Sequence, residues 1–284
     1  MTSAVSASIN KAEESKMRNR RHQHLFNLCR QCLPIFLFGL LTGCQDGPGG
    51  SHSPTADAVV FSGYGTWSPS VIAVTMMLRA RGLVTDTIGS VGSLAENLGN
   101  YQILVIPGGD PDNLLPELGP VGRSAILSFV NGGGGCLGLG GGAAVLSRTV
   151  NSRDGIPLLQ GEARWPVAEI GLPPNYLLTD VSLAAPDHPL GFGGRNLYTT
   201  LYRWGPRFIP ADSALVDVIY RYETTGAAAA VAFRYGFGTV FLAGFQPEIE
   251  ENSDRDSTDF AQELADPETE WDMLERALDY CWPR

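Results

Sequence analysis

The stretch Gly138-Leu139-Gly140-Gly141-Gly142-Ala143, which follows the apolar pair Cys136-Leu137, is typical of a strand that turns sharply into a helix. Glycines around the central residue permit this turn, because that residue takes a strained backbone conformation and its neighbours must not clash with it. Enzymes with this turn carry Ser or Cys at its centre. The central residue here is Gly140, which has no side chain on which a covalent intermediate can form.

The chain around this turn alternates between apolar runs and helical patterns. The runs 58–61 and 103–106 are continuously apolar, which is typical of strands covered on both faces of a parallel sheet. Apolar residues recur at helical spacing in 71–78 and 119–131. This alternation predicts an α/β fold with a single doubly wound, mostly parallel sheet flanked by helices.

The later part of the chain adds further strand signals. Residues 164–180 alternate in polarity, and apolar runs at 216–220, 229–233 and 239–243 predict further strands. Trp271, Leu274, Ala277 and Leu278 fall on one face of a helix predicted at about 268–280.

Four segments, in chain order, resemble the class I glutamine amidotransferase-like fold, and most closely its branch called the biotin-protein ligase N-terminal domain. They are Ile106-Pro107-Gly108-Gly109-Asp110, the helix at 122–126 with its glycine-rich end, the turn around Gly140, and Gly244-Phe245-Gln246-Pro247-Glu248. The resemblance covers about residues 57–282 and implies a flavodoxin-like sheet.

The resemblance also assigns roles to positions. Such amidotransferases carry a nucleophilic Cys at the turn and a His-Pro-Glu run later, which fall here on Gly140, Gln246 and Glu248. An amide such as that of Gln246 is not basic enough to take a proton from a thiol. The Cys-His chemistry of the family is therefore excluded, unless the register shifts to Cys136, which is better interpreted as a buried structural thiol.

The two glycine loops retain a capacity to bind. Amides at Gly141 and Gly142 open a helix whose dipole attracts a carboxylate or phosphate, and Gly108, Gly109 and Asp110 lie at the end of the neighbouring strand. We expect an anionic ligand in contact with these residues and with Gly140, Gln246 and Glu248. The alternative is that the glycines serve only the tight turn.

The first residues have the layout of a bacterial lipoprotein signal. Arginines precede an apolar run at 33–41, and Leu41-Thr42-Gly43-Cys44 resembles a lipobox. We expect cleavage after residue 43, a lipid on Cys44, a flexible tether at 44–56 and one domain at 57–284, with translation starting at Met1 or Met17. The residue after Cys44, Gln45, suggests an outer-membrane anchor facing the periplasm.

Without residues 1–43 the chain keeps 14 arginines against 28 acidic residues, a net charge of −14. Such a charge disfavours nucleic acid as a partner. We expect no cofactor. Cys136 and Cys281 are interpreted as free, buried thiols, and His188 as a structural residue.

One acidic run remains, at Glu248–Glu251 with Asp254, Asp256 and Asp259. Its oxygens would suit a hard cation such as Ca²⁺, but it lacks the spacing of an EF-hand, and charge runs are more often solvated surface. We therefore expect no metal.

Two functions fit these observations. The favoured one is a membrane-tethered, non-catalytic amidotransferase-like domain that binds a small anionic ligand or a protein partner. The alternative is a hydrolase or ligase-associated enzyme that uses a carboxylate, Glu248 or Asp110, in the same cleft.

Overall fold

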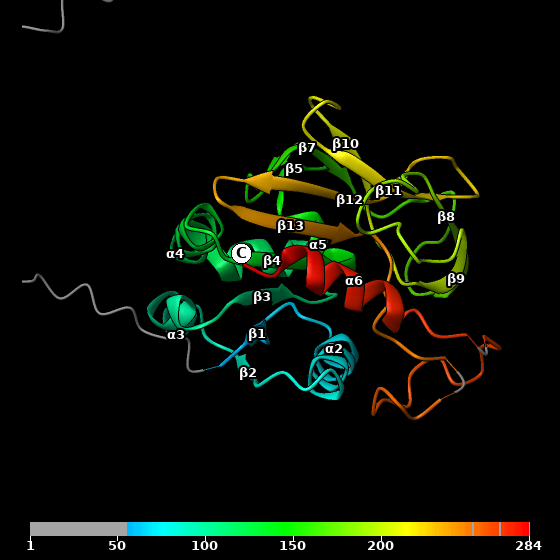
Figure 1. Ribbon diagram of the computed structural model, residues 1–284, viewed down its shortest axis with the longest axis horizontal. Coiled ribbons are helices and arrows are strands. Elements are labelled where there is room, and N and C mark those ends of the chain that lie inside the picture. Colours follow the sequence, from blue (N-terminus) through cyan, green and yellow to red (C-terminus); the bar gives the residue numbers. More distant parts are fainter. Residues whose placement is uncertain (1–55, 252, 267, 284) are drawn as a thin grey trace, which may run out of the picture. The chain divides into compact units, whose positions relative to one another are not determined.

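Five strands form the parallel part of the sheet, in the order β2 (Thr85–Ile88), β1 (Ala58–Phe61), β3 (Ile103–Ile106), β4 (Gly135–Leu139) and β13 (Gly238–Ala243) (Figure 1). Their carboxyl ends lie at one edge, where β4 runs directly into the helix α5 (Gly140–Val145). The computed structural model describes residues 56–251, 253–266 and 268–283, which belong to one compact unit. The predicted signal, the lipidation site Cys44 and the tether up to residue 55 lie outside these residues.

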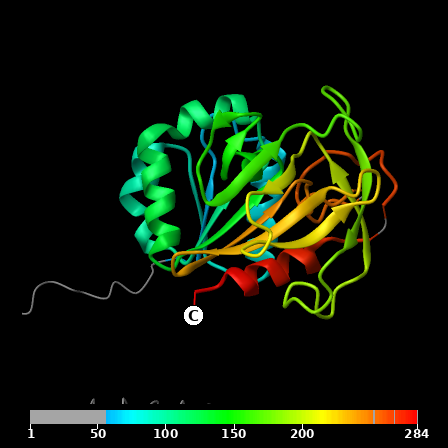
Figure 2. The same cartoon turned by 90° about the horizontal axis from the view of Figure 1, so that it is seen from above.

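Helices cover both faces of the parallel strands, as expected for a doubly wound sheet. Ala58 and Val60 of β1 pack on the side of α2 (Ser68–Ala80) and α6 (Trp271–Cys281). Val59 and Phe61 pack on the opposite side, with α3 (Val91–Asn97), α4 (Pro111–Asn131) and α5. Figure 2 shows α4 and α6 on opposite sides of the strands. The continuous apolarity of β1 and β3 is thus explained by burial on two faces.

Beyond β13 most neighbouring strands are antiparallel, and one pair, 147–150 with 159–164, is parallel. A short helix η1 (Leu98–Asn100) precedes β3. The remaining strands are β5 (Ser147–Val150), β6 (Arg153–Asp154), β7 (Leu159–Arg164), β8 (Leu177–Leu183), β9 (Leu197–Tyr202), β10 (Arg207–Pro210), β11 (Asp217–Tyr222) and β12 (Ala228–Tyr235). The turn after β9 approaches the end of β13, because Leu201 and Gln246 form an antiparallel bridge.

The predicted fold class is confirmed, with differences at several boundaries. The structure places strands at β11, β12 and β13, where apolar runs predicted them. The helix predicted at 119–131 begins at Pro111, because Asp110 caps it, and it breaks at Gly119, where φ is +51°. The alternation at 164–180 does not form one strand: β7 and β8 flank a loop that contains Pro166, Pro173 and Pro174, which cannot donate to a ladder.

No helix among the described residues is both long and apolar enough to cross a bilayer.

Candidate functional site

The position expected for a nucleophile is filled by another part of the chain. Gly140 has φ of +49°, the left-handed conformation that the turn requires. A Cβ atom built on Gly140 would collide with Nε2 of Gln246. The side chain at the expected base position therefore occupies the space into which a catalytic Cys would project.

Gly141 and Gly142 are explained by close packing. A Cβ atom on Gly141 would collide with the carbonyl oxygen of Gly109, and one on Gly142 with that of Pro107. Both glycines are fully buried at the start of α5. They allow the helix to pass directly beneath the loop that follows β3.

Gln246 is bonded to the backbone of a neighbouring loop. Its side chain is 1% exposed. Oε1 accepts a hydrogen bond from the amide of Arg203 at 2.7 Å, and Nε2 donates one to the carbonyl of Arg203 at 3.2 Å. A carboxamide offers a donor and an acceptor side by side, as a peptide group does. Gln246 therefore bonds to both the N–H and the C=O of Arg203 and fixes its backbone.

Glu248 does not contact the Gln246 side chain in any hydrogen bond among the described residues. The hydroxyl of Ser70 donates to Oε1 of Glu248, and the same hydroxyl accepts from the amide of Gly108 at 2.7 Å. Burial raises the pKa of Glu248 to about 8. The expected base-orienting acid thus braces the loop after β3, and one expected anion donor, the Gly108 amide, already has an acceptor.

A cleft of about 530 Å³ opens beside these buried groups, at the carboxyl ends of the strands. Of the residues predicted from sequence, the cleft is lined by Gly109 and Asp110 but not by Gly108, Gly140, Gly141, Gly142, Gln246 or Glu248. The carboxylate of Asp110 caps α4, accepting hydrogen bonds from the amide of Asp112 and the side chain of Asn113, both at 2.9 Å. Tyr64 and Trp67, which lie between β1 and α2, also line the cleft.

Arg203 is the residue of this cleft that sequence reasoning missed. Its guanidinium lies over the ring of Trp67 at 4.3 Å and over that of Trp204 at 4.0 Å. Burial lowers the pKa of Arg203 to about 10, and the charge of Asp110 acts in the opposite direction, so the group stays cationic at neutral pH. Within the described residues the guanidinium donates no hydrogen bond and forms no ion pair within 4.0 Å.

The neighbouring Trp204 is held in a strained conformation. Its φ is +55°, an outlier for a bulky residue, and its indole donates to the carbonyl of Asn175 at 2.6 Å. Gln246 therefore fixes the backbone of Arg203, and the carbonyl of Asn175 fixes the indole of Trp204. The only sequence signal for this arrangement is an adjacent Arg and Trp after a strand, and nothing in the sequence predicts the bridge that brings them to Gln246.

The two thiols and the histidine considered in the sequence analysis lie away from the cleft. Cys136 is buried near the start of β4, paired in register with Leu104 and Val240, and burial raises the pKa of its thiol. Cys281 lies nearby as a second free thiol. The ring of His188 packs against that of Tyr280 at a tilt of 53°, and burial lowers the pKa of His188, which fits a structural role.

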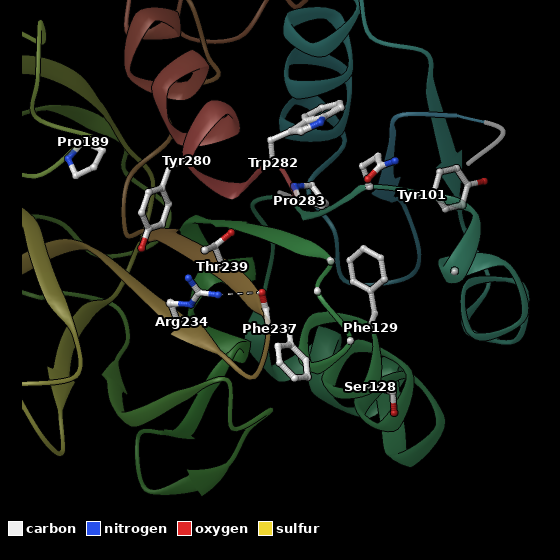
Figure 3. Close-up of a pocket in the computed structure, with 15 residues that line it drawn as sticks. Tyr101, Ser128, Phe129, Pro189, Arg234, Phe237, Thr239, Tyr280, Trp282 and Pro283 are labelled. Carbon is white, nitrogen blue, oxygen red and sulfur yellow. Dashed lines mark hydrogen bonds between the residues drawn. The ribbon is translucent and has the colours of Figure 1, made fainter. Parts of the chain in front are cut away.

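A larger cavity, of about 770 Å³, lies at the opposite end of the strands (Figure 3). Gln102 and Gly134, which line it, immediately precede β3 and β4. Of the residues that the structure describes, no Asp, Glu, His or Cys lines this cavity, and Arg234 donates to the carbonyl of Phe237 at 3.4 Å. The cleft of about 530 Å³ that Arg203 lines is called the Arg203 cleft below. Although the other cavity is larger, the Arg203 cleft is the better candidate site, because it lies where open α/β sheets bind ligands.

Comparisons with known proteins support the fold and leave the activity open. No family model matches the sequence, and no curated protein matches it. Among solved structures, the chain is similar to a glutamine amidotransferase at 16% identity and a TM-score of 0.56, over 78% of this chain and 97% of the other. It is also similar to a chain in the PurLQS structure from Thermotoga maritima at 15% identity and a TM-score of 0.53, over 79% and 98% of the two chains.

A third similar structure is a putative ThuA-like protein from Bacteroides uniformis, at 13% identity and a TM-score of 0.52, over 84% of this chain and 95% of the other. These similarities establish a class I glutamine amidotransferase-like fold.

Proposed function

We propose that this protein is a catalytically silent amidotransferase-like domain that binds a small anionic ligand in the Arg203 cleft. The observation that carries the proposal is the contact between Gln246 and Gly140. The amide at the former base position fills the former nucleophile position and fixes the backbone of a cationic residue at the cleft. Groups that would perform a reaction are replaced by groups that position Arg203.

The lining of the cleft suggests the class of ligand. The Arg203 guanidinium offers a fork of donors suited to a carboxylate or phosphate, and it has no such partner among the described residues. Tyr64, Trp67 and Trp204 supply aromatic surface around it. The volume of about 530 Å³ suits a small molecule. We therefore propose a small carboxylate with an apolar body.

In this proposal the residues predicted from sequence divide into two groups. Gly109 and Asp110 border the ligand. Gly108, Gly140, Gly141, Gly142, Gln246 and Glu248 hold the surrounding backbone. A protein partner that presents an acidic side chain to Arg203 would use the same chemistry, and Tyr64, 68% exposed at the rim, would contact it.

The location of the protein is proposed from sequence alone. The order of basic, apolar and small residues before Cys44 supports a lipid anchor, and Gln45 supports the periplasmic face of the outer membrane. The same segments that resemble the biotin-protein ligase N-terminal domain support placement in that branch. Mass spectrometry of membrane fractions tests the anchor: Cys44→Ala should abolish lipidation, and an unchanged mass and distribution would contradict it.

The ligand proposal is tested by calorimetry on the full chain in mild detergent. Glutarate, benzoate and inorganic phosphate serve as probes. Arg203→Gln should weaken binding of the best carboxylate by about tenfold or more, because it removes a hydrogen bond to a charged group. Arg148→Gln, at an exposed arginine of β5 outside the cleft, is the matched control and should leave affinity unchanged. Equal binding by both variants would contradict the proposal.

The alternative, an enzyme that uses a carboxylate, has less support. Glu248 is fully buried and does not line the cleft, and the oxygens of Asp110 accept the capping hydrogen bonds of α4. Glutaminase and esterase assays should give no turnover above background. A reproducible turnover that Asp110→Asn abolished, while the variant stayed folded, would favour the enzyme.

A further inference from the structure

Three carboxylates meet inside the segment that connects β13 to α6. Glu251 and Asp266 lie in the connection, and Glu270 immediately precedes α6. Their side chains are 2%, 4% and 0% exposed. One oxygen from each lies within 4.8 Å of the others. The sequence placed only Glu251 in an acidic run, and the expectation of a solvated run is wrong for this residue.

Most oxygens of these carboxylates lack hydrogen-bond donors among the described residues. Both oxygens of Glu251, both of Glu270 and Oδ2 of Asp266 have no hydrogen-bond partner among the described residues. The remaining oxygen, Oδ1 of Asp266, accepts from the amide of Glu268 at 3.0 Å. Buried carboxylates without donors are strongly unfavourable, so something else must compensate the charge.

The nearest positive group does not provide that compensation. Nη2 of Arg195 lies 3.9 Å from Oε1 of Glu270, and the same guanidinium is shared with Glu268, Asp272 and the carbonyl of Thr269. Burial, with added repulsion from neighbouring acids, raises the pKa of Glu251 to about 8 and that of Glu270 to about 10. These raised pKa values mean that the cluster favours a proton or a bound cation.

Neighbouring acids in the same segment show what satisfied carboxylates look like here. Asp256 accepts from the amides of Glu250 and Thr258 and from the hydroxyl of Thr258. Glu250 accepts from the hydroxyl of Thr269 and lies 3.6 Å from Nη1 of Arg255. The segment therefore supplies donors to Asp256 and Glu250. The carboxylates of the cluster instead face one another.

We propose that Glu251, Asp266 and Glu270 bind a hard divalent cation of the Ca²⁺ class. The donors are all carboxylate oxygens, which favours Ca²⁺ or a similar ion over metals that prefer His or Cys. The spacing fits, because oxygens on opposite sides of a Ca²⁺ ion with bonds of 2.3–2.6 Å lie about 5 Å apart. The site depends on no residue of the Arg203 cleft.

A cation at this position would tie the connection to the start of α6. Phe260, in the same connection, packs edge-on against Trp67 with ring centroids 4.6 Å apart, and Trp67 stacks on Arg203. The ion would thus order a segment that supports one aromatic wall of the cleft.

The experiment uses the full chain in mild detergent, stripped with EDTA and returned to metal-free buffer. Ca²⁺ should raise the midpoint of thermal unfolding. Tb³⁺ should give saturable luminescence on excitation of indole, because Trp271 is adjacent to Glu270 and buried, and Ca²⁺ should displace it. No shift and no displaceable luminescence in the parent would overturn the proposal and favour carboxyls that share protons.

Variants locate the ion. Glu270→Gln should abolish the Ca²⁺-dependent shift and weaken Tb³⁺ binding by at least tenfold, because it removes one of the three charged ligands. The raised pKa of about 10 means that Glu270 holds a proton at neutral pH without the metal, so the neutral amide should leave the metal-free protein folded. Asp254→Asn is the matched control, since Asp254 is an exposed acid of the same connection. Retention of the Ca²⁺ response in Glu270→Gln, or its loss in Asp254→Asn, would overturn the assignment. If Glu270→Gln does not fold, Glu251→Gln takes its place.

Discussion

The turn around Gly140 and the acidic cluster after β13 satisfy their polar groups in opposite ways. At the turn, the Gln246 amide pairs with the Arg203 backbone and fills the space next to Gly140. In the cluster, five carboxylate oxygens are buried without a donor from any residue that the structure describes. Polar groups that pair within the chain need no ligand, whereas buried groups left unpaired indicate where a ligand belongs. The turn at which the sequence resemblance predicts a nucleophile is thus the self-contained region here.

The largest effect is expected at the turn. Gly141→Ala should destabilise the protein by about 3 kcal/mol or more, because the new methyl group collides with backbone that cannot move aside. Gly92→Ala makes the same change in α3 with open space around it, and should stabilise by about 0.5–1 kcal/mol. Urea unfolding measures both. Similar values for the two variants would show that the turn is not tightly packed.

Glu248 combines the two situations, because Oε1 accepts a hydrogen bond from Ser70 whereas Oε2 has no partner in the described part of the chain. Its folded pKa of about 8 lies above that of the unfolded chain, so the folded state holds the proton more tightly. This contribution to stability is complete below the unfolded pKa and is lost as pH rises toward 8, with a slope of at most about 1.4 kcal/mol per pH unit.

Glu248→Gln should therefore flatten the fall in stability between pH 5 and pH 8, which urea unfolding across that range measures. Glu263→Gln, at an exposed acid whose pKa is lowered, is the control and should retain the fall. An unchanged pH dependence in Glu248→Gln would mean that this carboxyl is ionised in the folded protein.

The contact at Gly140 is tested by a double-mutant cycle. Gly140→Ala should cost about 1–2 kcal/mol, since φ of +49° is unfavourable for Ala and the Gln246 amide must move. Gln246→Ala removes the obstacle but also the bonds to Arg203. The double variant should be more stable than the sum of the single effects predicts. Additive effects in urea unfolding would indicate that the two residues are not in contact.

The smallest expected effect is a coupling between the proposed cation site and the Arg203 cleft. If both proposals hold, Ca²⁺ should strengthen carboxylate binding a few-fold, because Phe260 of the cation-bound connection packs on Trp67. Calorimetry in Ca²⁺ and in EDTA measures this, and Phe260→Ala should remove the difference. Equal affinities in parent protein under both conditions would mean that the two sites act independently.

The fold was largely predictable from sequence, because apolar runs such as 103–106 report burial on both faces of a sheet directly. Gly140 could be placed at the turn because glycines surround it directly after an apolar strand. The cleft was not predictable: Arg203 approaches Gln246 only through the bridge between Leu201 and Gln246, which leaves no periodic signal. The acidic cluster was missed because Asp266 and Glu270 are distant in sequence from Glu251, and local charge density does not report burial.

The most direct test of this comparison between the turn and the acidic cluster is a crystal structure of the chain grown with Ca²⁺ and glutarate. We predict the Gln246 amide against Gly140 and bonded to Arg203, a carboxylate on the Arg203 guanidinium, and an ion between Glu251, Asp266 and Glu270. A ligand on the Gly141 amide with Gln246 turned away, and no ion between the three carboxylates, would contradict this view.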